Sequence, residues 1–161
     1  MLIRPADTDD VADLVSLFEE WGHPLSSADV RAVMAEWGST ARSEVLVAEI
    51  DGEVAGMVAV SAGPRLAEPG RYGHLSGLAV ATNHRRRGVG TALLQAAEGY
   101  AYGWGCGRLE LTSSRSREAA HDFYRRHGYE ETSQHHARYV RLFDRDPPSP
   151  VIGIGPVAGQ T

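Results

Sequence analysis

The stretch that decides the fold is residues 74–104, HLSGLAVATNHRRRGVGTALLQAAEGYAYGW. Its first third, entered from Tyr72, alternates as a β-strand does. This alternation assigns one face to Tyr72, His74, Ser76, Leu78 and Val80, and the other to Leu75 and Ala79. Its last third repeats apolar residues at spacings of three and four, which predicts an amphipathic helix that ends at the glycine-rich segment 103–107. Between the two lies Arg85-Arg86-Arg87-Gly88-Val89-Gly90, a basic turn at a helix N-terminus.

This turn, residues 85–90 (the basic turn), has the composition of an anion site. The first N–H groups of a helix lack partners within it, and that end carries roughly half a unit of positive charge. Glycines let the backbone approach a phosphate, and arginines add charge-assisted hydrogen bonds. The alternative is a solvated basic turn that only begins a helix.

Two common phosphate motifs do not fit the turn. A P-loop needs a lysine, and the chain contains none. The dinucleotide fingerprint needs a small residue three places after its second glycine, but here Gly90 is followed by Thr91, Ala92 and Leu93.

The turn resembles the acyl-CoA pyrophosphate loop of the GNAT acetyltransferase superfamily. That family has Arg or Gln, two residues, Gly, one residue, then Gly or Ala, and this chain has Arg85-x-x-Gly88-x-Gly90. The preceding Leu78-Ala79-Val80 matches the family's strand ending, although Thr82 stands where a proline is frequent. A second match is AHDFYRRHGYEE at 120–131, and the resemblance extends over about residues 1–143.

The resemblance implies a fold and a domain layout. The fold is α/β (α+β), with a mixed central sheet of about seven strands that is splayed in the middle and covered by helices on both faces. Residues 1–143 would form the acyltransferase domain. The Pro/Gly-rich tail 144–161 holds half of the chain's eight prolines, and we expect it to pack against its own domain or a second subunit.

The resemblance also implies roles for individual residues, with acetyl-CoA as cosubstrate. Backbone N–H groups of the strand would bind the pantetheine arm and the thioester carbonyl, at Leu78, Ala79 and Val80. The diphosphate would be bound by Arg85 and Arg86 and by the amides of Arg87, Gly88, Val89, Gly90 and Thr91. Tyr124 would protonate the departing thiolate. The family's usual asparagine is replaced by Arg117, which could reach the cofactor phosphates.

The general base is left open among His23, His74, Glu44 and Glu49, because solvent can also accept the proton of the amine. His135 and His136 resemble a metal pair, but neighbours on a strand face opposite sides, so no metal is predicted. A CoA-binding module without transfer activity, and an acyltransferase with a longer acyl donor, are the alternatives to an N-acetyltransferase.

Charge and composition limit the kinds of partner that the protein can have. The net charge is −5, yet residues 1–60 hold twelve Asp or Glu and three Arg, and residues 61–161 hold nine and thirteen. This favours a polyanionic cofactor and a cationic small-molecule or peptide amine, unless both halves are only solvated surface. No nucleic-acid or membrane pattern is present, and a lone Cys106 indicates a reducing cytoplasm. A homodimer is possible.

The rest of the chain is expected to form hairpins and helices. Strands are expected at 1–5, 45–50, 53–60, 108–112, 129–132 and 137–143, with an Asp51-Gly52 hairpin turn and a loop at 61–71. Helices are expected after caps at Asp7 or Thr8, at Ser26 or Ser27, and near Ser116, the last ending at Gly128. Gly77 inside the central strand indicates a bulge or a close backbone approach.

Overall fold

The computed structural model describes residues 1–133. Its contacts divide the chain into two compact units, Met1–Ser114 and a second that begins at Arg115, and each is described by itself. The predicted strand at 137–143, the domain boundary after residue 143, the tail and the His135–His136 pair lie outside the described residues.

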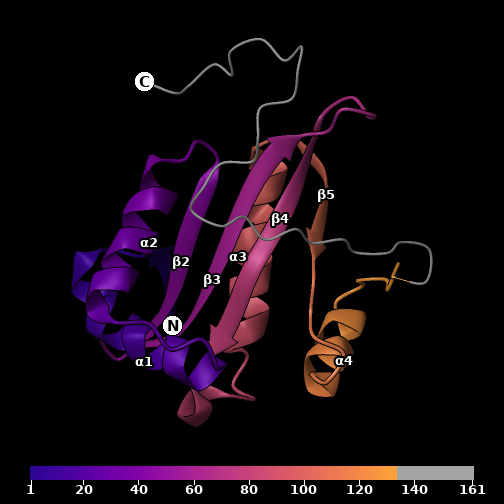
Figure 1. Cartoon of the computed structure of the whole chain (residues 1–161). Helices are drawn as coiled ribbons and strands as arrows, with labels where there is room; N and C mark the ends of the chain where they lie inside the picture. Colours follow the sequence, from indigo (N-terminus) through magenta and orange to yellow (C-terminus); the bar gives the residue numbers. More distant parts are fainter. Residues whose placement is uncertain (134–161) are drawn as a thin grey trace, which may run out of the picture. The chain divides into compact units, whose positions relative to one another are not determined.

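The first unit is built on one five-stranded sheet with the strands in chain order (Figure 1). The strands are β1 (Leu2–Pro5), β2 (Ser43–Ile50), β3 (Glu53–Pro64), β4 (Arg71–Val80) and β5 (Cys106–Leu111). The first four strands are antiparallel to one another, and β5 is parallel to β4. A parallel neighbour requires a crossover, which α3 (Val89–Gly103) supplies.

Two of the other four helical segments of this unit begin at residues whose side chains cap them. The four are the 3₁₀ turn η1 (Thr8–Asp10), α1 (Val11–Trp21), α2 (Ser27–Ser39) and the 3₁₀ turn η2 (Thr82–His84). The Asp7 side chain caps η1, and Ser26 and Asp29 form a reciprocal capping box on α2. Gly22, with φ +86°, ends α1.

Helices α1 and α2 cover one face of the sheet and α3 covers the other (Figure 1). The α1–α2 face packs on Val47, Met57 and Ala79. On the opposite face α3 packs closely on Gly56 of β3. A Cβ added at Gly56 would lie 3.0 Å from Leu93 and 3.2 Å from Val89 of α3. The predicted mixed sheet with helices on both faces is confirmed.

The bulge predicted in the central strand is present. Ala59 of β3 pairs with Gly77 and Val60 with Leu75, so Ser76 is an extra residue in β4. The bulge also makes the predicted alternation wrong, because it reverses the faces after Ser76. His74 pairs with Ser61, whereas Leu78 pairs with Val58 three residues away, so the two side chains lie on opposite faces.

Gly77 has a second reason to be glycine. A Cβ at this position would lie 2.5 Å from Cη2 of Trp21, the last residue of α1. The indole therefore packs directly on the β4 backbone beside the bulge.

Gly77→Ala is expected to lower the free energy of unfolding by about 2 kcal/mol, because the added methyl overpacks this contact. Gly38→Ala in α2 is the matched control, since a Cβ there meets nothing within 4 Å. It should be neutral or stabilising by up to about 1 kcal/mol. Urea unfolding measures both, and equal values for the two variants would contradict the packing.

Arg4 of β1 is joined to η1 and to β2 by two part-buried ion pairs, with Asp10 and with Glu49. The Arg4 guanidinium donates to both oxygens of Asp10 at 2.7 and 2.8 Å, and its Nε donates to Glu49 at 2.8 Å. Asp10 is 4% exposed. The hydrogen bonds from Arg4 hold the pKa of the Asp10 carboxyl below its usual value, and the Asp7 amide acts in the same direction.

Asp10→Asn is expected to destabilise the fold by about 2 kcal/mol at pH 7, because Arg4 loses a charged partner. The folded pKa of Asp10 is depressed, so its contribution is complete above the unfolded value near 4 and is lost as the pH falls through the folded pKa. The difference between wild type and variant should thus shrink below about pH 4. Asp9→Asn, at an exposed neighbour, is the control.

Several predicted boundaries differ from the structure. Strand β3 continues through Ser61–Pro64, so the predicted loop 61–71 is reduced to residues 65–70. The described residues contain five strands rather than seven. Residues 129–133 are not a strand, and in their place Glu131 accepts hydrogen bonds from Ser133, Arg115 and Arg125.

The second unit contains α4 (Glu118–Arg126) as expected. Gly128 follows it with φ +84°, and the amides of Gly128 and Tyr129 bond back to the last turn. Tyr124 is in this helix, and its ring contacts those of Phe123 and Tyr129.

Candidate functional site

Strand β4 has a free outer edge at its carboxyl end. The ladder to β5 begins at Arg71 and ends at Leu75, whereas β4 continues to Val80. Leu78, Ala79 and Val80 pair with β3 on one side, and within residues 1–133 no strand pairs with them on the other. Peptide groups alternate in direction along a strand, so this edge presents donors and acceptors to an extended ligand.

The basic turn follows this edge directly. Arg86 has φ +59° and Gly88 has φ +81°, a backbone path that reverses direction before α3 begins at Val89. Val89 is 1% exposed and anchors the helix start in the core. No side chain caps α3, and a Cβ on Gly88 would meet nothing within 4 Å. The start of α3 is thus open in the way that an anion site requires.

The three arginines of the turn have different contacts. Arg85 Nε donates to the Val80 carbonyl at 3.1 Å, and Arg87 lies 3.3 Å from Nδ1 of His84, which is 8% exposed. In the described part of the chain, the Arg86 guanidinium has no hydrogen-bond or ion-pair partner. Arg85 and Arg87 thus each make one hydrogen bond within this segment, and the roles of Arg85 and Arg86 in binding a diphosphate stay predictions.

Tyr124 lies on α4, and Arg117 is the residue that directly precedes the first turn of this helix. Burial raises the pKa of the Tyr124 phenol, and the positive charge of Arg117 partly opposes this effect. The phenol therefore keeps its proton at neutral pH, as a proton donor must.

Residues 9–129 match the model of the acetyltransferase (GNAT) family, a range that contains β4, the basic turn and α4. The chain belongs to the GNAT acetyltransferase family. It is 32% identical over 139 residues to the aminoglycoside N(6′)-acetyltransferase type 1 of Klebsiella aerogenes, covering 83% of this chain and 91% of that protein.

This GNAT chain has the same fold as solved structures of acetyltransferases. An aminoglycoside 6′-N-acetyltransferase from Acinetobacter haemolyticus is 25% identical with a TM-score of 0.72, covering 92% of this chain and all of that one (100%). A putative acetyltransferase from Agrobacterium tumefaciens has a TM-score of 0.78 at 21% identity, covering 88% and 100% of the two chains. The second likeness supports the fold alone.

The candidate bases of this GNAT domain are dispersed. His23 follows α1 and its ring lies 4.6 Å from that of Trp21, beside the bulge of β4. His74 is on β4, on the face opposite to Leu78. Glu49 is ion-paired to Arg4 at the β1 side, and Glu44 is on β2. His23 is therefore linked to Gly77 of β4 only through Trp21.

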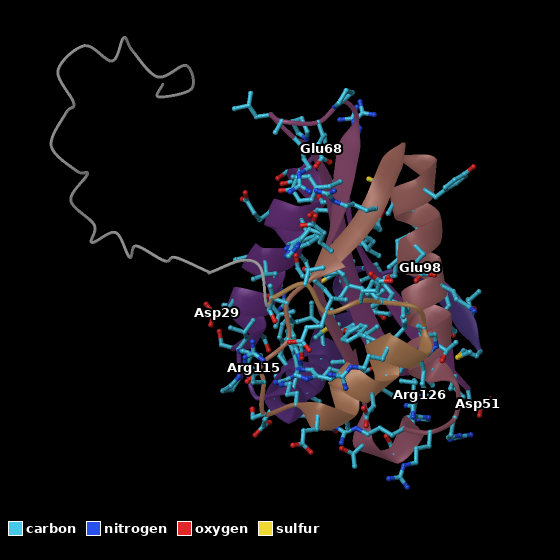
Figure 2. All side chains as sticks on the ribbon, turned by 90° about the vertical axis from the view of Figure 1, so that its right-hand side faces the viewer. Asp29, Asp51, Glu68, Glu98, Arg115 and Arg126 are labelled. Carbon is cyan, nitrogen blue, oxygen red and sulfur yellow. The ribbon has the colours of Figure 1, made fainter. Side chains whose placement is uncertain are left out.

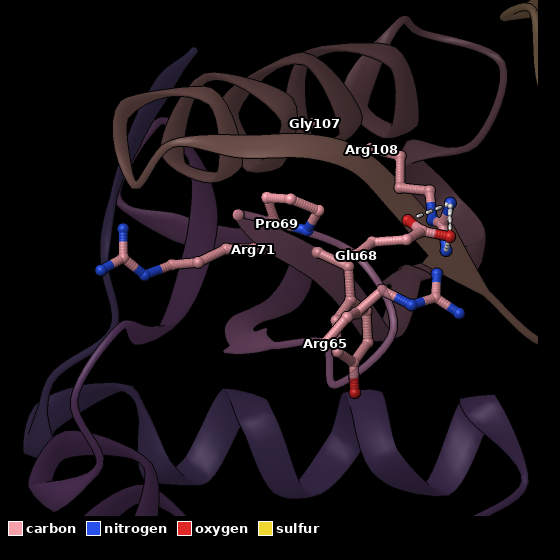
Figure 3. Close-up of a pocket in the computed structure, with 8 residues that line it drawn as sticks. Arg65, Glu68, Pro69, Arg71, Gly107 and Arg108 are labelled. Atoms are coloured by element: carbon pink, nitrogen blue, oxygen red, sulfur yellow. Dashed lines mark hydrogen bonds and ion pairs between the residues drawn. The ribbon is translucent and has the colours of Figure 1, made fainter.

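A pocket of about 140 Å³ lies elsewhere on the sheet (Figure 3). It is at the amino end of β4, near Arg71, roughly 30 Å along the strand from Val80. Most of its charges are paired, because Arg65 bonds to Glu110 and Arg108 bonds to Glu68 and Glu110. Arg71 donates to the Trp104 carbonyl. It is distinct from the proposed cofactor site.

The acidic residues of the first sixty positions do not form one patch. Asp29 on α2 and Asp51 on the β2–β3 turn project at opposite sides of the first unit (Figure 2).

No cluster of three metal-ligating side chains occurs among the described residues. Within residues 1–133, no helix is both long and apolar enough to cross a membrane.

Sequence patterns missed two residues near the turn. His84 is buried under Arg87, and Glu20 in the last turn of α1 accepts hydrogen bonds from Thr82. Neither lies in a motif, and the Glu20 contact joins residues 62 positions apart. Only the folded chain brings α1 to this end of β4.

Proposed function

We propose that this chain is an acetyl-CoA-dependent N-acetyltransferase that acetylates a primary amine of a polycationic small molecule of the aminoglycoside type. The observation that carries the proposal is the uncapped start of α3 at the basic turn, which directly follows the free edge of β4. A diphosphate fits the first feature and an extended arm with amide groups fits the second.

Acetyl-CoA, the acyl donor, would be bound by residues of the first unit. Arg86 and the amides at Gly88–Thr91 would bind the diphosphate, with Arg85 and Arg87 maintaining the shape of the turn. Leu78–Val80 would pair with the arm and direct an N–H group at the thioester carbonyl, where negative charge develops. Holding the cofactor far from its reactive end positions the acetyl group, an effect that supplies several kcal/mol of the barrier reduction.

Tyr124 would complete the transfer. The neutral amine forms a C–N bond to the acetyl carbon as the C–S bond breaks, and the phenol of Tyr124 gives its proton to the departing thiolate. The amine loses one proton to solvent or to a base such as His23. The positive charge of Arg117, just before α4, would stabilise the phenolate that forms when the proton leaves.

The acceptor class is supported by similarity and by charge. The 32%-identical relative is named for acetylation of aminoglycosides at N(6′). The surplus of acids in residues 1–60 favours a cationic acceptor over a neutral one. A homodimer and a cytoplasmic location remain predictions.

The test is release of free thiol from acetyl-CoA with a panel of amines. We expect turnover with an aminoglycoside that has a 6′-amino group and none with its 6′-hydroxyl counterpart. Turnover with polyamines or peptides alone would contradict the acceptor class. Binding of CoA without turnover on any amine would favour a binding module, and faster reaction with longer acyl-CoA esters would favour the other alternative.

A further inference from the structure

Glu20 lies in the last turn of α1 and contacts the entry of the basic turn. Its Oε2 accepts from the Thr82 amide and from the Thr82 hydroxyl, both at 2.8 Å. These bonds hold the pKa of the Glu20 carboxyl below its usual value, and the charge of Arg85 acts in the same direction. Glu20 is thus an ionised side chain engaged by two donors of one residue.

The neighbouring residue contacts β4 at a second point. Trp21 packs on Gly77, before the segment Leu78–Val80, and Glu20 bonds to Thr82 after it. One helical turn therefore contacts the chain on both sides of the segment proposed to bind the thioester. Ala81 adds a backbone bond from its amide to the Ala55 carbonyl at 3.0 Å.

We propose that Glu20 is a positioning residue that fixes the basic turn for the acyl donor by holding Thr82. The inference rests on the proposed function and concerns the donor side of the same site. Glu20 touches neither the diphosphate nor the reacting atoms in this scheme. Its loss leaves the turn to be ordered by the donor itself, which weakens donor binding and leaves the chemical step unchanged.

The first experiment is a double-mutant cycle on Glu20→Ala and Thr82→Val. Glu20→Ala removes both hydrogen bonds to Thr82 and is expected to raise KM for acetyl-CoA about tenfold, with kcat and KM for the amine within about twofold of wild type. Thr82→Val removes the hydroxyl bond but keeps the amide bond, so it should raise KM for acetyl-CoA about threefold. The double variant should be no worse than Glu20→Ala alone, because both changes act on one contact. Glu19→Ala, at the adjacent exposed glutamate, is the control and should match wild type.

Two rescues separate positioning from a general loss of structure. Glu20→Gln keeps an acceptor oxygen and should recover most of the affinity for acetyl-CoA. Thr82→Pro in the Glu20→Ala background should recover it by another route, since Ala81 has φ −53° and ψ +138°, a conformation compatible with a following proline. Proline also favours the first position of a helical turn such as η2.

Two outcomes would overturn the inference. One is a Glu20→Ala variant with unchanged KM for acetyl-CoA, and the other is additive effects of Glu20→Ala and Thr82→Val. In both, wild-type turnover would leave the proposed function standing. A wild-type protein that neither binds nor consumes acetyl-CoA would remove the proposed function and the role of Glu20 with it.

Discussion

Tyr124→Phe is expected to lower kcat by about 100-fold or more while KM for acetyl-CoA changes little. Phenylalanine keeps the ring contacts with Phe123 and Tyr129 but removes the only proton that the side chain can donate. Since burial raises the phenol's pKa, wild-type activity should show no loss from tyrosine ionisation up to about pH 10. Steady-state kinetics with a saturating amine measure the change.

Tyr102→Phe is the matched control. Tyr102 is 84% exposed on α3, and we expect wild-type kinetics from this variant. Thiol release at an undiminished rate from Tyr124→Phe would remove Tyr124 from the mechanism. Equal losses in both tyrosine variants would indicate a nonspecific effect.

Arg86→Ala is expected to weaken CoA binding at least about tenfold, because a charge-assisted bond to a phosphate contributes about 1.5–3 kcal/mol. Arg86 lacks a partner among the described side chains, so its removal should leave the free energy of unfolding within about 0.5 kcal/mol of wild type. Calorimetric titration with CoA, and separately with pantetheine, measures the effect. Pantetheine has no diphosphate, and its binding should be unaffected.

Arg31→Ala removes an exposed arginine on α2 and controls for net charge. Its CoA affinity should equal that of wild type. An Arg86→Ala variant that binds CoA as tightly as Arg31→Ala would show that the diphosphate is bound elsewhere.

Local chemistry made much of this fold predictable. Asp51-Gly52 indicated a hairpin turn because both positions need positive φ, and they have φ +53° and +84°. Gly77 indicated either a bulge or a close approach, and both occur, at Ser76 and at Trp21. The basic turn between β4 and α3 was predicted for the same reason, since its glycines and its helix start are adjacent in the chain.

Features that depend on distant contacts were not predictable. The bulge at Ser76 reversed the faces of β4, and alternation alone cannot reveal a one-residue insertion. Glu20 sits in an amphipathic helix like any exposed glutamate, and its bond to Thr82 follows from the packing of α1 on the sheet. A strand at 129–132 was wrong because a short polar segment needs a pairing partner that its own residues do not specify.

Backbone amide NMR of the protein titrated with CoA tests the central claim most directly. If the basic turn binds the diphosphate, the largest shift changes should occur at the amides of residues 86–91. Pantetheine should spare these amides and perturb Leu78–Val80 alone. Saturable CoA binding that leaves the amides of 86–91 unmoved would contradict the account.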